Sequence, residues 1–184
     1  AAWRARLAGL PGRRVGLVWA GNPERFRMDR RRSVPPALLA PLAAVPGISW
    51  ISLQKPAPTV WPFTEGPADG GQADGAAPDA SSPPNHDGPP VPRLFDPSAE
   101  LADFADTAAL VAALDLVIGV DTAVVHLAGA LGRPVWLLNR FDTDWRWGRD
   151  RTDSPWYPTL RQFRQPHAGD WESVIGAVAA ALDA

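Results

Sequence analysis

The 184-residue sequence contains no cysteine, which excludes disulfide bonds and thiolate metal sites. No apolar run approaches the roughly 18 residues that a membrane-spanning helix needs, and the first residues lack the apolar segment of a signal peptide. The formal net charge is only −2, so no overall basic field points to nucleic acid. We therefore expect a cytoplasmic protein with no membrane span and no nucleic-acid partner.

Lysine is almost absent, since Lys55 stands alone among 17 arginines. The abundance of alanine and proline makes a GC-rich genome one explanation, and a binding role for Lys55 is another. The pattern Gly-x-Gly-x-x-Gly is missing after every apolar run, which argues against a dinucleotide-dependent oxidoreductase. The first residue is not methionine, so we expect a fragment of a longer protein.

Strand and helix signals alternate along the chain, which favours βαβ units and a mostly parallel sheet. Apolar runs predict strands at 15–19, 48–53, 92–95, 116–120, 135–138 and 160–163. Helices are expected at the N-terminus up to residue 10, at 35–44, 107–114 and 122–131, and after a cap at Asp170. The predicted fold class is α/β, a Rossmann-like doubly wound parallel sheet in a single domain spanning residues 1–184.

Two other segments stand out. Residues 65–90 hold five glycines, six prolines and no large aliphatic residue, so we expect a disordered insertion within the domain. Residues 24–32 form a strongly charged loop, of which one or two arginines could bind a ligand while the others form a solvated surface.

The most informative segment is 121–126, which follows the apolar run 116–120 and precedes the helix expected at 122–131. Asp121 is a natural N-cap, which would place Thr122 and Ala123 in the first helical turn. Backbone N–H groups, a hydroxyl and the positive end of a helix would then meet at the carboxyl end of a parallel strand. Such a place suits a phosphate, and it is where ligands bind in doubly wound sheets.

These residues also carry a resemblance to a family. Asp121-Thr122-Ala123-Val124-Val125-His126, followed by residues 127–135, resembles the Asp-Thr-Gly-x-x-His segment of the heptosyltransferase-like glycosyltransferases, glycosyltransferase family 9. These are GT-B enzymes with two Rossmann-like halves, of which the second binds the nucleotide-sugar donor. Residues 19–22 and 32–35 are similar to the first strand, glycine turn and basic residue of that half. Ala123 stands where the family has glycine, Arg32 where it has lysine, and Val34 where it has tryptophan.

The Trp-rich segments 144–147 and 153–158 resemble a subgroup whose catalytic region follows tetratricopeptide repeats, as in protein O-glycosyltransferases. Trp145, Trp147 and Trp156 could stack on a base or a sugar. Packing against the sheet edge or against a missing partner domain is the alternative explanation for them.

The resemblance implies the donor-binding half of an inverting, metal-independent glycosyltransferase that uses a nucleotide-diphosphate sugar and no separate cofactor. The acceptor would be a saccharide or a protein, bound with the general base by an N-terminal domain or helical repeats that this chain lacks. We expect the isolated chain to bind donor weakly and to turn over little. A non-catalytic Rossmann-like interaction module, or a degenerate nucleotide-binding module, is the alternative.

The expected donor site contains no metal ligand and no assigned catalytic residue. Thr122 and Ala123 would hold a phosphate, and Arg32, or Arg30 as second choice, would neutralise it. The full set of expected contacts is Gly21, Asn22, Arg30, Arg32, Gln54, Lys55, Asp103, Asp121, Thr122, Ala123 and His126. Gly21 and Asn22 would allow close backbone approach or contact a phosphate or sugar hydroxyl. Gln54 and Lys55 would face the ribose or base, and Asp103 would lie at a helix start that flanks the base.

Structural explanations compete with several of these roles. Asp121 could serve only as a helix cap, and His126 could be a satisfied interior histidine. Gly21 could serve only a turn.

Overall fold

The computed structural model describes residues 2–22, 29–55, 63 and 94–184. The expected insertion at 65–90 lies outside the described residues, as do the first residues of the charged loop and of the strand expected at 92–95. Within the described part, no helix combines the length and the apolar character needed to cross a membrane.

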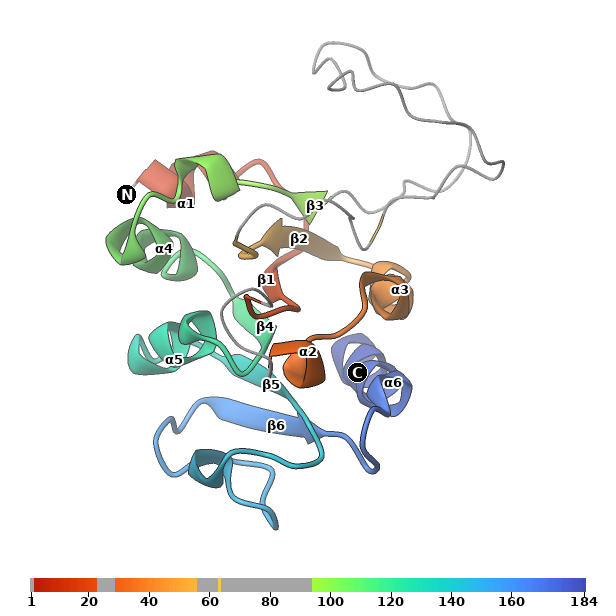
Figure 1. The fold of residues 1–184 in the computed structure, drawn as a ribbon. Helices are drawn as coiled ribbons and strands as arrows, with labels where there is room; N and C mark the ends of the chain where they lie inside the picture. Colours follow the sequence, from red (N-terminus) through yellow and green to blue (C-terminus); the bar gives the residue numbers. More distant parts are fainter. Residues whose placement is uncertain (1, 23–28, 56–62, 64–93) are drawn as a thin grey trace.

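One six-stranded sheet, parallel throughout, forms the centre of the molecule (Figure 1). Its strands are β1 (Arg13–Val18), β2 (Ile48–Ser52), β3 (Leu94–Phe95), β4 (Leu116–Val120), β5 (Val135–Asn139) and β6 (Leu160–Arg164). Their order is β3-β2-β1-β4-β5-β6, so β1 and β4 are neighbours although two strands separate them in the sequence. This order confirms the predicted doubly wound α/β fold and places its topological switch point between β1 and β4.

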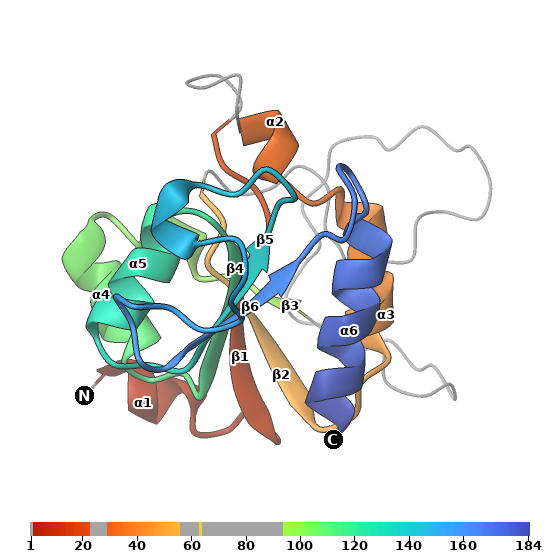
Figure 2. The same ribbon diagram turned by 90° about the horizontal axis from the view of Figure 1, so that it is seen from below.

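Helices cover both faces of the sheet (Figures 1 and 2). One face carries α1 (Ala2–Leu7), α4 (Phe104–Val111) and α5 (Ala123–Ala130), and the other carries α3 (Ala40–Ala43) and α6 (Trp171–Asp183). The short helix α2 (Asp29–Arg32) lies beyond the carboxyl ends of the strands (Figure 2). Three 3₁₀ turns complete the described elements: η1 (Pro36–Leu39), η2 (Ser98–Glu100) and η3 (Trp145–Trp147).

Alternation along the strands divides the core between the two faces. In β4, Leu116, Ile118 and Val120 pack with the α3 and α6 side, whereas Val117 packs with the α4 and α5 side. All five residues of β4 are buried, which explains why the sequence shows a continuous apolar run there rather than an alternating one.

The helix starts are governed by side chains that the sequence only partly reveals. Asp170 caps α6 as predicted, accepting a hydrogen bond from Ser173 N at 3.0 Å. Asp103 caps α4 by accepting from Ala105 N and Asp106 N, which agrees with the helix start expected at Asp103 from the family resemblance. The helix therefore begins three residues before Thr107, where the apolar pattern alone had placed its start.

Two other predicted segments need correction. The helix expected at 35–44 is divided into η1 and α3, because Pro41 has no N–H with which to continue the α-helical ladder. The charged loop ends in the helix α2, whose first residue, Asp29, is buried and pairs with Arg32 one turn later.

Candidate functional site

A cleft of about 520 Å³ opens at the carboxyl ends of β1, β2 and β4, beside the switch point of the sheet. The predicted contacts that line it are Gly21, Asn22, Arg32, Lys55, Asp103, Thr122 and Ala123. Apolar side chains of Val18, Leu53, Leu101 and Phe104 form part of its walls. Arg30, Gln54, Asp121 and His126, which were also predicted to contact a ligand, are not among the lining residues.

The start of α5 faces this cleft, but the cap differs from the predicted one. Thr122, and not Asp121, is the N-cap, with extended backbone (φ −135°, ψ 166°), and its side chain makes no capping hydrogen bond. Ala123 and Val124 are the first helical residues, so their N–H groups have no acceptor within the helix. Among the described residues the buried Thr122 Oγ1 also has no hydrogen-bond partner. A positive helix end and two N–H groups therefore meet at the cleft, and the unpaired Thr122 hydroxyl lies buried next to them.

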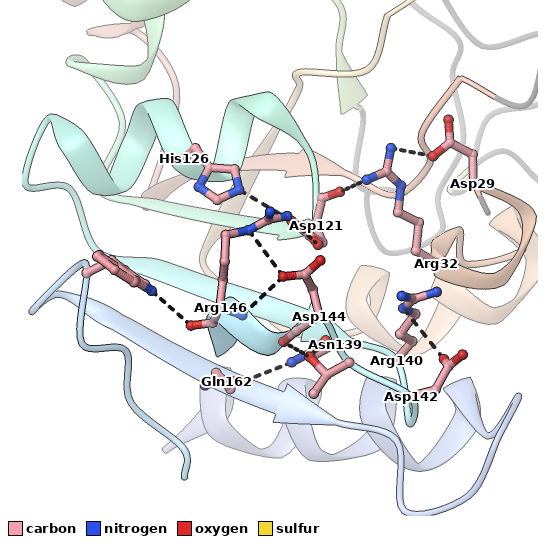
Figure 3. A network of polar contacts seen from close by, with 12 residues as sticks. Asp29, Arg32, Asp121, His126, Asn139, Arg140, Asp142, Asp144, Arg146 and Gln162 are labelled. Carbon is pink, nitrogen blue, oxygen red and sulfur yellow. Dashed lines mark hydrogen bonds and ion pairs between the residues drawn. The ribbon is translucent and has the colours of Figure 1, made fainter. Parts of the chain in front are cut away.

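Arg32 reaches the same turn from α2. Its Nη1 donates to the Asp121 carbonyl oxygen at 2.6 Å, and its Nη2 pairs with the carboxylate of Asp29, which is 1% exposed (Figure 3). The guanidinium thus joins the end of β4 to α2 and compensates a buried negative charge. The predicted position of Arg32 beside the turn is observed, whereas the second choice, Arg30, lies exposed on α2 away from the cleft.

Gly21 has a packing reason for lacking a side chain. A Cβ atom there would lie 2.6 Å from Asp29 Cγ and 3.0 Å from Arg32 Nε. Its N–H donates to Ser33 Oγ at 3.1 Å. Gly21 therefore makes room for the Asp29–Arg32 ion pair, a role that the sequence did not indicate.

Gln54 is 4% exposed and serves the backbone rather than a ligand. Its Oε1 accepts from Trp19 N at 3.2 Å and Ala20 N at 3.0 Å, and its Nε2 donates to the Ala20 carbonyl oxygen at 3.1 Å. The side chain that was expected to face a ribose or base instead ties together the ends of β1 and β2. Lys55 does line the cleft, and its Nζ donates to the Leu101 carbonyl oxygen.

Behind the turn, the Asp121 carboxylate enters a network with the Trp-rich loop (Figure 3). Its Oδ1 lies 3.4 Å from His126 Nε2, and its Oδ2 lies 3.9 Å from an Arg146 Nη. The His126 ring stacks on Trp147 at a centroid distance of 5.1 Å, and His126 Nδ1 lies 2.9 Å from Tyr157 Oη. Asp121 and His126 thus hold the turn in place and do not line the cleft.

The pKa of the Asp121 carboxyl group reflects this network. Burial acts to raise the pKa, but the neighbouring His126 and Trp147 side chains and the charge of Arg146 outweigh it and hold the pKa below its ordinary value. Asp121 is therefore a carboxylate at neutral pH and can attract the positive side chains around it. The sequence indicated this network only through the cluster of tryptophans, and it gave no sign of the part that Arg146 and Tyr157 play in it.

Asp103 lines the cleft, but both of its contacts through Oδ1 are capping bonds to the α4 backbone. In the part of the chain that the structure describes, no three His, Asp or Glu side chains are grouped so that they could hold a metal ion.

Two comparisons with known proteins give matches. Residues 100–167, which include α4, β4, α5 and the Trp-rich loop, match the family model described as Glycosyltransferase family 9 (heptosyltransferase). Protein FlbA of Caulobacter vibrioides is 34% identical over 185 residues, which cover 98% of this chain and 27% of FlbA. The chain thus spans about a quarter of the length of this relative. No solved structure matches. Residues 100–167 are therefore similar to glycosyltransferase family 9, the family that the segment Asp121–His126 resembles.

Proposed function

We propose that this chain is the donor-binding half of an inverting, metal-independent glycosyltransferase that uses a nucleotide-diphosphate sugar and no separate cofactor. The observation that carries the proposal is the start of α5, where the Ala123 and Val124 N–H groups meet a cleft of about 520 Å³ and the buried Thr122 Oγ1 beside them has no partner among the described residues. The match of residues 100–167 to glycosyltransferase family 9 supports the same reading.

Glycosyl transfer breaks the bond between the anomeric carbon and a diphosphate oxygen, so negative charge grows on the diphosphate. Fixed donors and positive groups at that place lower the barrier, because they need no reorganisation as the charge develops. The α5 N-terminus, Arg32 and Lys55 supply such groups around the cleft. These residues bind and orient the leaving group, and that requires no metal ion.

The acceptor and the general base belong to other parts of the longer protein, either an N-terminal Rossmann-like half or helical repeats. The acceptor is a saccharide or a protein side chain. We assign no catalytic residue within this chain. Asp121, the carboxylate next to the turn, is already engaged by His126 and Arg146 and does not line the cleft. The chain by itself should bind donor weakly and turn over little.

Calorimetric titration with UDP, GDP, ADP, CDP and dTDP, in the presence of EDTA, tests the proposal. At least one diphosphate should bind saturably. Thr122→Val removes the hydroxyl at nearly constant volume and should weaken this binding about tenfold, the usual effect of losing one hydrogen bond to a charged group. Thr159→Val is the matched control, because Thr159 is exposed next to the amino end of β6, far from the carboxyl ends of the strands, and its hydroxyl donates to the Arg133 carbonyl oxygen.

Arg32 needs a different design. Removing it alone would leave the buried Asp29 carboxylate without its partner and could unfold the protein. We therefore compare Asp29→Asn with the double variant Asp29→Asn/Arg32→Gln. If Arg32 contacts a phosphate, the double variant should bind the diphosphate at least tenfold more weakly than the single variant.

The alternative is a non-catalytic Rossmann-like module. One observation favours it, since the Arg32 guanidinium is already bound to Asp29 and to the Asp121 carbonyl oxygen. If no diphosphate binds to a folded protein at millimolar concentration, the alternative is supported and the transferase proposal is overturned.

A further inference from the structure

Two tryptophans of the Trp-rich loop project into solvent. Trp145 is 76% exposed and Trp156 is 55% exposed, whereas Trp147 between them in sequence is fully buried. Large aromatic side chains are normally placed where most of their surface is covered. The packing explanation therefore applies to Trp147 and does not apply to this exposed pair within the described chain.

The exposed pair is held in one arrangement. The two rings meet edge to face, with centroids 6.3 Å apart and planes at 84°. Trp156 Nε1 donates to the Arg146 carbonyl oxygen at 3.0 Å, and Trp156 N donates to Ser154 Oγ. Asp144 caps the turn that carries Trp145 by accepting from Arg146 N at 3.0 Å. A preorganised aromatic surface of this kind loses little entropy when a ligand binds.

The segment that carries the pair is linked to the start of α5 through its neighbouring residues. Arg146, the neighbour of Trp145, reaches Asp121 Oδ2 at 3.9 Å, and the next residue, Trp147, stacks on His126 of α5. The side chains of Arg146 and Asp144 remain 41% and 28% exposed, so both can still reach a ligand. An aromatic surface, a guanidinium and a carboxylate thus stand together on the segment that packs behind the turn where a diphosphate would lie.

We propose that Trp145 and Trp156 form a platform on which a pyranose ring stacks, with Arg146 and Asp144 available to its hydroxyl groups. A pyranose has one apolar face of C–H groups and a polar rim, which fits a flat indole bordered by charged side chains. The inference rests on the proposed function. The ring belongs either to the sugar of the donor or to a saccharide acceptor, because both must lie next to the diphosphate.

A protein partner fits this place less well. Exposed charged residues at 149–151 and 153 follow Trp145 and precede Trp156, so the apolar area is limited to the two rings. Stable protein interfaces bury about 600 Å² or more on each partner, and two indoles provide only about 300–500 Å² even when they are fully covered.

The test compares Trp145→Ala with Trp145→Phe, and uses Phe141→Ala as a control because Phe141 is another exposed aromatic that follows β5. Calorimetry measures the binding of nucleotide sugars, and of the free diphosphate of each for comparison. The nucleotide sugars are UDP–glucose, UDP–N-acetylglucosamine, GDP–mannose, ADP–glucose and dTDP–glucose. Saturation-transfer NMR detects the binding of four free sugars: glucose, mannose, galactose and N-acetylglucosamine. If the platform binds sugar, Trp145→Ala should weaken sugar binding about 3- to 10-fold, and Trp145→Phe should retain most of it.

The outcomes separate the sources. If Trp145→Ala weakens binding of a nucleotide sugar but not of its free diphosphate, the ring is that of the donor. If only the free-pyranose signals fall, the ring is that of an acceptor. If the wild-type protein binds a diphosphate but no pyranose depends on Trp145, the platform is refuted while the proposed function stands.

If pyranoses bind through Trp145 but no nucleotide binds at all, the platform stands and the proposed function fails. If no pyranose binds, either as part of a nucleotide sugar or as a free sugar, the platform is refuted. A change in oligomeric state alone in Trp145→Ala would also overturn it, because the pair would then be a contact between protein copies.

Discussion

Gly129 and Gly176 offer a paired test of how the Trp-rich loop is fastened to the fold. Both are helical glycines, in α5 and α6 respectively, and both would gain helix propensity from alanine. At Gly176 a Cβ atom would meet nothing within 4 Å. At Gly129 it would lie 2.5 Å from Tyr157 Cγ and 2.7 Å from Cδ1, the part of the ring nearest the backbone. The same substitution should therefore have opposite effects at the two positions.

The magnitudes follow from two opposing terms. Replacing glycine by alanine within a helix contributes up to about 1 kcal/mol of stability. Overpacking of a closely filled contact costs about 1–3 kcal/mol, and Tyr157 cannot give way cheaply because its hydroxyl lies 2.9 Å from His126 Nδ1. We expect Gly176→Ala to raise the free energy of unfolding by about 0.5–1 kcal/mol. Gly129→Ala should lower it by up to about 2 kcal/mol, the overpacking cost less the helix gain.

Urea unfolding followed by circular dichroism measures both changes. Since the clash is with the Tyr157 ring, Gly129→Ala should cost less in a Tyr157→Ala background, which a double-mutant cycle quantifies. If Gly129→Ala is as stabilising as Gly176→Ala, Tyr157 does not pack on α5 as described, and the attachment of the loop to the His126 side chain is refuted.

Three further predictions concern single side chains. Trp147→Ala should lower the free energy of unfolding by about 3–5 kcal/mol, because the indole is fully buried, and a loss below 1 kcal/mol in urea unfolding would contradict its place in the core. The hydrogen-bonded Arg14 side chain holds the pKa of Asp115 below its ordinary value, so the stability this pair contributes is present above about pH 4 and is lost as pH falls through the lower folded-state pKa. Urea unfolding between pH 6 and pH 2 should therefore show a smaller loss of stability for Asp115→Asn than for the wild type, and equal losses would refute the pair. Gly21→Ala should displace Asp29, destabilise the protein by about 1–3 kcal/mol and weaken diphosphate binding, and unchanged unfolding would show that the space beside Gly21 is open.

The sequence predicted the central strands well because most of their residues are buried. The run 116–120 has the same bounds in the structure as in the prediction, since five apolar residues between polar neighbours define a strand by themselves. The start of the following helix was predicted one residue too early. Asp121 is a good capping residue in isolation, but its carboxylate is used by His126 and Arg146 instead.

Side-chain roles that depend on distant residues could not be predicted. Gln54 bonds Ala20, which lies 34 residues away, and a single sequence gives no sign of that contact. The tryptophans could not be told apart by composition either. Trp145 and Trp147 lie at the two ends of a 3₁₀ turn, which directs one to solvent and the other into the core.

The most direct measurement is a titration of the ¹⁵N-labelled protein with the diphosphate that binds, followed by the backbone amide resonances. The Ala123 and Val124 N–H groups should show the largest shifts, because they are the first-turn donors that face the cleft. The amides around Arg149, Arg151 and Arg164, a second surface rich in arginine at the edge strand β6, serve as the internal reference. Shifts at that reference surface with none at Ala123 and Val124 would contradict a diphosphate site at the start of α5.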